Sequence, residues 1–172
     1  MKQFFLAAVL GIFAFAGVVF AKDMKIAYIN SQQIMAEFQE SLDAQKQLES
    51  EESEYKKKLD GMEVEITKMR DTFEKQSAMM TEEKQKEKYN EIRAKMDGYE
   101  KFQRETWGPE GKLYQRNAEL TKPILEKVNA VIKKIGELDG YDYIFDVVPG
   151  SIVYAKPTDD ITQKILDELQ KK

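Results

Sequence analysis

The side chains that most often carry catalysis or bind metals are missing from this chain. It contains no histidine and no cysteine, which excludes a Ser-His-Asp triad, a thiol nucleophile, a disulfide and any zinc site built from these residues. The adjacent acids Glu51-Glu52 and Asp159-Asp160 suggest acid–base chemistry, but neighbouring residues on a helix point in different directions. No nucleophile has a recognisable base in the pattern. We therefore expect no enzyme, no metal site and no cofactor.

Composition describes an acidic, highly charged chain that is long enough for about one domain. Its 172 residues include 27 Lys or Arg and 31 Asp or Glu, giving a formal net charge of −4, and 42% of them are hydrophobic. That hydrophobic fraction is too high for a disordered tail. The acidic balance argues against a nucleic-acid partner.

The first 21 residues predict export. Lys2 precedes an uninterrupted run of apolar and small residues from position 4 to 20, and the run ends at Ala21 just before charged Lys22. This layout is typical of a signal peptide, so we expect residues 1–21 to be removed by cleavage between Ala21 and Lys22. The alternative is an uncleaved membrane anchor, because a run of this length is near the lower limit for spanning a bilayer.

An apolar repeat predicts a long antiparallel helical hairpin. Residues 31–80 contain no proline, and their apolar side chains recur at alternating steps of three and four, which is typical of a coiled coil. The repeat comprises Leu48, Tyr55, Leu59, Met62, Ile66, Met69, Phe73 and Met80. Thr81 followed by two glutamates predicts a new helix start. We therefore expect helices over 31–80 and 82–138 that meet at a tip near residue 81.

Two prolines are expected to interrupt the second helix. Gly108-Pro109 removes a backbone donor and favours a kink, with Pro109 as the first residue of a restarted helix, and Pro123 is expected to do the same further on. Such positions are hinges in some proteins and static kinks in others, and both interpretations remain open. Trp107 beside the first kink is expected to be a packing anchor.

Both ends of the mature chain predict a small β/α body. Residues 25–29, 141–146 and 151–154 have strand patterns, and the third is expected to pair back on the second as a hairpin. Asp159 or Asp160 is expected to cap a last helix over 161–169. A body this small favours pairing of its strand edges with other subunits.

The predicted fold class is therefore α+β, with a long antiparallel coiled-coil hairpin, the arm, projecting from a small β-rich trimerisation body. The expected domain division assigns residues 22–47 and 121–172 to the body and residues 48–120 to the arm.

This order of elements resembles the Skp/OmpH family of periplasmic chaperones. The resemblance rests on residues 25–31, the Tyr-Asp-Tyr-Ile-Phe-Asp strand at 141–146, residues 152–155 and the Asp-Ile-Thr start of the last helix at 160. It implies a homotrimer whose strands share one β-body and whose arms enclose a cavity. It also implies that unfolded outer-membrane β-barrel proteins are held there, without ATP, in the periplasm. The remaining alternative is a structural or adaptor coiled coil that spaces envelope components.

Charge separates this chain from familiar members of that family, which are strongly basic. Its pI is near 5.2, so we expect only weak contact with a membrane surface. The lysines at 56–58 and at 84, 86 and 88 are either solvated helix faces or a weak electrostatic attraction for clients.

The candidate client-binding residues are apolar side chains near the tip, because thioethers and aromatic rings suit a surface that accepts many sequences. They are Met69, Phe73, Met79, Met80, Tyr89, Ile92, Met96 and Tyr99. Each is alternatively part of the seam between the helices, although adjacent Met79 and Met80 cannot both be. The candidate oligomerisation residues of the body are Ile26, Tyr28, Ile144, Phe145, Ile152 and Tyr154.

Overall fold

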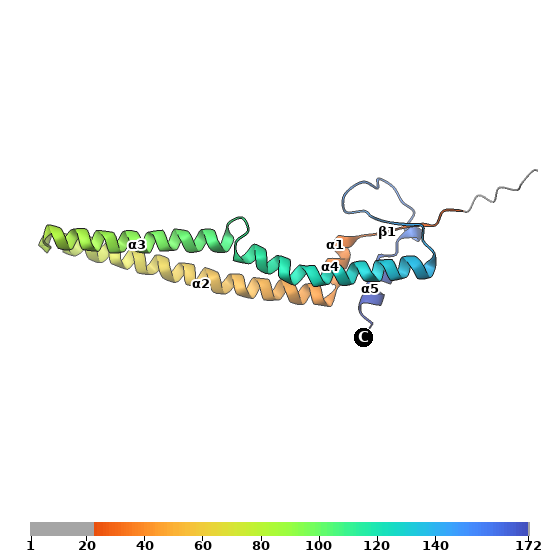
Figure 1. The fold of residues 1–172 in the computed structure, drawn as a ribbon, viewed down its shortest axis with the longest axis horizontal. Coiled ribbons are helices and arrows are strands. Elements are labelled where there is room, and N and C mark those ends of the chain that lie inside the picture. The colour runs from red at the N-terminus through yellow and green to blue at the C-terminus, as the bar shows by residue number, and fades with distance from the viewer. Residues whose placement is uncertain (1–22, 172) are drawn as a thin grey trace, which may run out of the picture.

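The computed structural model describes residues 23–171. A long two-helix arm projects from a small body, and both ends of the described chain lie at the body (Figure 1). The expected signal peptide and its cleavage site between Ala21 and Lys22 lie outside the described residues. The predicted fold class, a mostly helical hairpin on a small β-containing body, is confirmed.

The arm is built from one outgoing helix and two returning helices. Helix α2 (Gln39–Gln76) runs to the tip, where η1 (Ser77–Met79) precedes the reversal, and α3 (Glu82–Trp107) and α4 (Lys112–Asp139) return along it. Thr81 caps α3, since its hydroxyl accepts the Lys84 N–H at 3.3 Å. Gly140 ends α4 in the left-handed conformation at φ 68°, which glycine adopts without steric cost.

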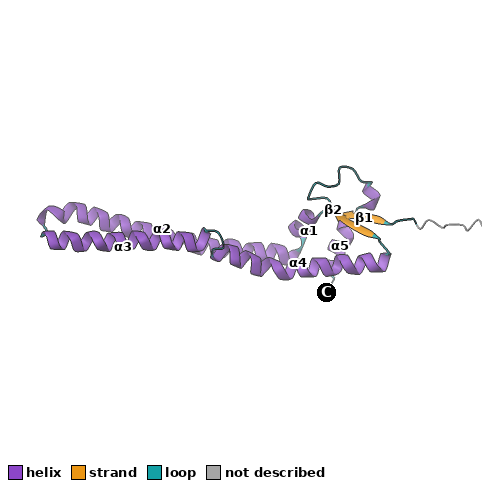
Figure 2. Cartoon of the chain, turned by 45° about the horizontal axis from the view of Figure 1, so that its top comes forward, coloured by secondary structure: helices purple, strands orange, loops and turns teal. Residues whose placement is uncertain are grey.

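The body joins the two ends of the chain. Strand β1 (Ile26–Ile29) pairs in parallel with β2 (Tyr143–Asp146), so that Ile26 lies opposite Tyr143 (Figure 2). Helix α1 (Ser31–Glu37), η2 (Pro157–Asp159) and α5 (Thr162–Leu169) complete it. The Asp160 carboxylate accepts the Thr162 N–H at 2.8 Å at the start of α5. The shared core comprises Ala27, Ile29, Ile34, Phe38, Ile124, Val128, Ile135, Ile161, Ile165, Leu166 and Leu169.

The single helix predicted over residues 31–80 is wrong at Phe38. This residue is extended (φ −73°, ψ 124°) and separates α1 from α2. Its buried ring joins the body core, and α1 packs against α5 while α2 packs against α4. The break therefore results from tertiary packing, and no glycine or proline marks it in the sequence.

The hairpin predicted for residues 151–154 is also wrong. Within the described residues the sheet has two strands, and the chain after β2 forms a loop that arches away from the body (Figure 1). The chain then returns to the other edge of β1, where the Ile161 N–H donates to the Tyr28 carbonyl at 3.0 Å. Both edges of β1 are thus occupied without a hairpin.

The interruption predicted at Gly108-Pro109 is confirmed, but neither proline is the first residue of a restarted helix. Pro109 lies in the turn between α3 and α4, and α4 begins at Lys112 with Gly111 as its N-cap. Pro123 lies inside α4, which is continuous from Lys112 to Asp139. Its ring is exposed, so the helix passes it with the ring toward solvent.

Candidate functional site

The outer part of the arm is held by a narrow apolar seam between α2 and α3. Ile66 of α2 and Ile92 of α3 are buried in it, whereas Met62, Met69 and Phe73 are only half-buried. A two-helix seam buries one stripe of each helix and leaves both flanks of that stripe open. The candidate site is on these flanks.

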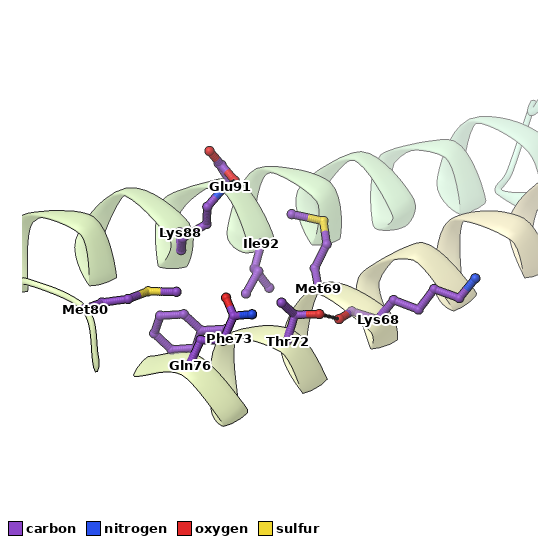
Figure 3. Close-up of a pocket in the computed structure, with 9 residues that line it drawn as sticks. All are labelled: Lys68, Met69, Thr72, Phe73, Gln76, Met80, Lys88, Glu91 and Ile92. Atoms are coloured by element: carbon purple, nitrogen blue, oxygen red, sulfur yellow. Dashed lines mark hydrogen bonds and ion pairs between the residues drawn. The ribbon is translucent and has the colours of Figure 1, made fainter. Parts of the chain in front are cut away.

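An apolar groove of about 220 Å³ opens on one flank near the tip. Figure 3 shows Met69, Phe73 and Met80 gathered around Ile92. We call this the tip groove; it is lined by Lys68, Met69, Thr72, Phe73, Gln76, Met80, Lys88, Glu91 and Ile92.

Three of the five polar side chains at the tip groove have a hydrogen-bond or ion-pair partner within the chain. The Thr72 hydroxyl donates to the Lys68 carbonyl at 2.7 Å, and the Lys88 ammonium lies 2.6 Å from a Glu91 carboxylate oxygen. What remains for an outside molecule is therefore mainly the methionine and aromatic surface, which adapts to apolar groups of different shape.

A second groove, of about 450 Å³, opens on the opposite flank. We call it the arginine groove; it is lined by Arg70, Phe73, Tyr89, Ile92, Arg93, Met96, Asp97 and Glu100. Phe73 and Ile92 line both grooves. The hairpin is thus thin here, and one pair of side chains separates its two faces.

The candidate client-binding residues lie in three grooves and at the turn. Met69, Phe73, Met80 and Ile92 line the tip groove, Tyr89 and Met96 line the arginine groove, and Tyr99 lines a neighbouring groove with Met96. Met79 is 85% exposed at the turn, whereas Ile92 is only 7% exposed and packs in the seam.

The sequence analysis did not identify the polar residues that line the arginine groove, chiefly Arg70 and Arg93. A signal was present, because each lies one residue from an apolar position of the repeat, and such positions flank a seam.

Four lysines of the arm, Lys56, Lys84, Lys88 and Lys101, form ion pairs along their own helix. Lys56 lies 2.9 Å from Glu52, and Lys84 lies 2.6 Å from Glu87. The hydrogen bond to Glu87 and its charge raise the pKa of Lys84, and the same hydrogen bond lowers the pKa of Glu87. Pairs of this kind reduce the field that a lysine-rich face presents to distant anions.

An aromatic cluster joins the outer arm to the part near the body. Tyr55, Phe102 and Trp107 contact one another edge-to-face, with ring centroids 6.1 to 6.4 Å apart. The Lys58 ammonium lies 4.8 Å from the centre of the Phe102 ring, within range of a cation–π interaction. Trp107 is therefore a packing anchor, as the sequence predicts.

The outer face of the sheet is an apolar surface. Ile26, Tyr143 and Phe145 are 47%, 53% and 44% exposed, and the rings of Tyr143 and Phe145 stack at 5.9 Å. Half-buried Tyr28 lies opposite Phe145 in the register.

Other oligomerisation candidates lie elsewhere. Ile144 packs against the body core, on the side of the sheet away from Tyr143 and Phe145, because alternate residues of a strand face opposite sides; its part in oligomerisation stays a prediction. Ile152 and exposed Tyr154 lie in the loop after β2.

Asp146 at the end of β2 positions this sheet on α1. Its carboxylate accepts the Ser31 hydroxyl at 2.6 Å, the Val148 N–H at 3.1 Å and the Ser31 N–H at 3.2 Å. Burial alone would raise the pKa of Asp146, but these three hydrogen bonds outweigh burial and lower it.

Within residues 23–171, no cluster of three or more acidic, histidine or cysteine side chains has a geometry that would hold a metal ion. Over the same residues, no helix combines the length and apolarity needed to cross a membrane.

Comparison with known proteins assigns this architecture to a family. No curated protein matches the chain in sequence. A crystal structure of a candidate OmpH-like outer membrane chaperone from Caulobacter crescentus superimposes with a TM-score of 0.76; it covers 85% of this chain and 83% of the other at 10% identity. A family model described as outer membrane protein (OmpH-like) matches residues 25–169. Because that match includes the body and the whole arm, the chain belongs to the OmpH-like family.

Proposed function

We propose that the protein is an ATP-independent periplasmic holdase, which keeps unfolded outer-membrane β-barrel proteins from aggregating in a cavity between helical arms. The observation that carries the proposal is the pair of open grooves, lined by thioether and aromatic side chains, on an arm that projects from the body. Flexible thioethers suit partners without a fixed shape. Weak contacts on several arms sum to useful affinity and release one at a time.

The proposal includes export with cleavage between Ala21 and Lys22, and a mature body and arm divided at residues 22–47, 48–120 and 121–172. It includes no catalytic activity and no cofactor. Contact with anionic membranes is expected to be weak, because the chain is acidic overall and the arm lysines at 56, 84 and 88 have carboxylate partners.

Aggregation of a urea-unfolded outer-membrane barrel, followed by light scattering after dilution, tests the holdase. We expect the mature chain to suppress scattering at about three chains per client, as for one trimer. Deleting residues 62–99 removes both grooves but keeps the Tyr55–Phe102–Trp107 cluster, and should abolish most of the suppression.

Val64→Ala is the matched control, because Val64 is exposed on α2 and lines neither groove. Absence of suppression by the wild-type chain at any ratio contradicts the holdase proposal. The envelope spacer would then lead, and the shortened arm should keep its end-to-end partners in altered geometry.

We infer further that the working unit is a homotrimer assembled through the outer face of the sheet. Two strands of four residues are too few for an independently stable sheet, and Ile26, Tyr143 and Phe145 leave that face apolar and open. Native mass measurement should give a trimer that Phe145→Asp dissociates and Val64→Asp on the arm leaves intact. A monomeric wild-type protein contradicts this inference.

A further inference from the structure

The four arginines of the chain differ in their partners. Arg104 lies 3.7 Å from a Glu100 oxygen, and Arg116 lies 2.8 Å from Glu51 and 3.3 Å from Glu119. Arg70 and Arg93 are different: among residues 23–171, neither guanidinium has a carboxylate within ion-pair distance. The polar contact of Arg70 is with the Met96 sulfur at 2.7 Å.

Both arginines without a carboxylate partner line the same groove. Arg70 comes from α2 and Arg93 from α3, and the arginine groove between them also presents Phe73, Tyr89 and Met96. Tyr89 is mostly exposed. A guanidinium offers a planar set of donors that matches a carboxylate, and aromatic and thioether side chains favour contact with another aromatic ring.

We propose that the arginine groove recognises an extended polypeptide segment in which a carboxylate stands next to an aromatic residue. The carboxylate pairs with Arg70 and Arg93, and the aromatic ring lies against Tyr89, Phe73 and Met96. This inference rests on the proposed function and names the feature of an unfolded client that the site selects. Charge complementarity carries it, because among residues 23–171 neither guanidinium has a carboxylate within ion-pair distance; Asp97 and Glu100 line the groove but lie beyond that distance.

The acidic side chains of the groove favour a peptide over an anionic lipid. Asp97 and Glu100 line the same groove, and their charges repel a multiply charged phosphate headgroup. A peptide segment presents a single carboxylate, which the two acids repel less strongly, and its backbone N–H groups donate hydrogen bonds to the carboxylates of Asp97 and Glu100. Arginines without a carboxylate partner, acids and an aromatic surface together therefore fit an extended polypeptide.

Fluorescence anisotropy with short, unstructured, labelled Gly/Ser-rich peptides tests this directly on the mature chain. The probe peptide contains Asp-Phe pairs, and its two controls contain Asn-Phe or Asp-Ala pairs. Exposed ion pairs and aromatic contacts have modest strength, so we expect each control peptide to bind about fivefold more weakly.

The variant R70Q/R93Q should bind the Asp-Phe peptide about fivefold more weakly than the wild type and bind the Asn-Phe peptide with unchanged affinity. R70K/R93K keeps the charge but loses the two-pronged geometry, so its loss should be intermediate. K57Q/K86Q is the matched control: it removes the same charge, one residue from each arm helix, outside the groove. It should leave the preference for Asp-Phe intact.

Several results would overturn the inference. If R70Q/R93Q and K57Q/K86Q weakened binding of the Asp-Phe peptide equally, the net charge of the arm alone would explain the effect. Arginine-dependent binding to vesicles containing phosphatidylglycerol, without arginine-dependent peptide binding, would assign the groove to lipid. If the wild-type chain suppresses barrel aggregation but does not discriminate among the peptides, only this inference fails. If it discriminates among peptides but suppresses no aggregation, the proposed holdase function fails instead.

Discussion

The body and the outer arm bury apolar residues in different ways. In the body, side chains from β1, α1, α4 and α5 meet in one continuous core. In the outer arm, the buried apolar residues of α2 and α3 within the described chain are Ile66, Ile92 and Phe102, spaced along the seam. Apolar area removed from water is the main stabilising term, so the free energy of local opening should be high in the body and low along the arm.

This difference is consistent with the separate roles proposed for the two regions. A continuous core holds the body as one cooperative unit, which suits a base that must present arms in a defined geometry. A seam flanked by grooves can shift its half-buried methionines with little loss of packing, which suits a surface for changing partners.

The largest effect is expected from Ile165→Ala in the body. Ile165 of α5 is fully buried, so the change should lower the free energy of unfolding by about 2–5 kcal/mol through lost burial and a new cavity. Urea denaturation followed by circular dichroism measures this. Leu138→Ala, at an exposed site on α4, should have almost no effect; equal losses at the two sites would contradict the single-core description.

A smaller and more local effect is expected from Phe102→Ala in the arm. Phe102 contacts Tyr55 and Trp107, but a two-helix seam relaxes around a lost ring more readily than a closed core does. We expect a loss of about 2 kcal/mol. Hydrogen exchange should show lost protection in α2 and α3 and retained protection in α5. Loss of protection in α5 as well would mean that arm and body unfold as one unit.

The turn between α3 and α4, which contains Gly111, should tolerate an added methyl group poorly. A Cβ on Gly111 would lie 2.8 Å from the Thr106 carbonyl and 2.9 Å from the Glu105 and Gly108 carbonyls. Gly111→Ala should therefore cost about 1 kcal/mol. Thermal unfolding measures this, with Gly98→Ala as a control because nothing lies within 4 Å of its added Cβ. If Gly111→Ala is as stable as the wild type, the turn is less tightly packed than described.

Acid should weaken the body more than the arm. Hydrogen bonds from Lys134 and Lys171 lower the pKa of Glu168 to about 2, and the pKa of Asp146 is also lowered. A carboxyl whose folded pKa is depressed stabilises the fold above its unfolded pKa, and that contribution is lost as pH falls through the folded value. For Glu168 the loss extends from about pH 4.5 down to about pH 2.

The urea midpoint of the body should therefore decline over that range. Glu168→Gln should make the urea midpoint depend less steeply on pH. Glu87→Gln, which removes an exposed ion pair within one arm helix, should change that dependence little. An unchanged slope in Glu168→Gln would show that other groups control the acid response.

Local patterns account for the features of this protein that the sequence predicts. The spacing of three and four residues leads to the seam between α2 and α3, because side chains at that spacing share one helix face. Thr81 and the two glutamates after it mark the start of α3, since the cap and the helix dipole act within one turn. Gly140 marks the end of α4 for a similarly local reason.

Features that depend on contacts between distant segments could not be predicted from local sequence patterns. The break at Phe38 exists because its ring enters the body core, and the second edge of β1 is closed by Ile161, far along the chain. The predicted hairpin assumed that neighbours in sequence pair, whereas the strands pair across the whole arm.

The amino-acid sequence by itself therefore determined the helical hairpin of the arm, the start of α3, the end of α4 and the apolar seam, because capping and helical periodicity act over a few residues. Only the tertiary structure decided which flank of the seam is apolar and which carries the unpaired Arg70 and Arg93. It also decided which face of the sheet stays open. These properties depend on the relative rotation of packed helices and strands, which is set by contacts between residues far apart in the chain.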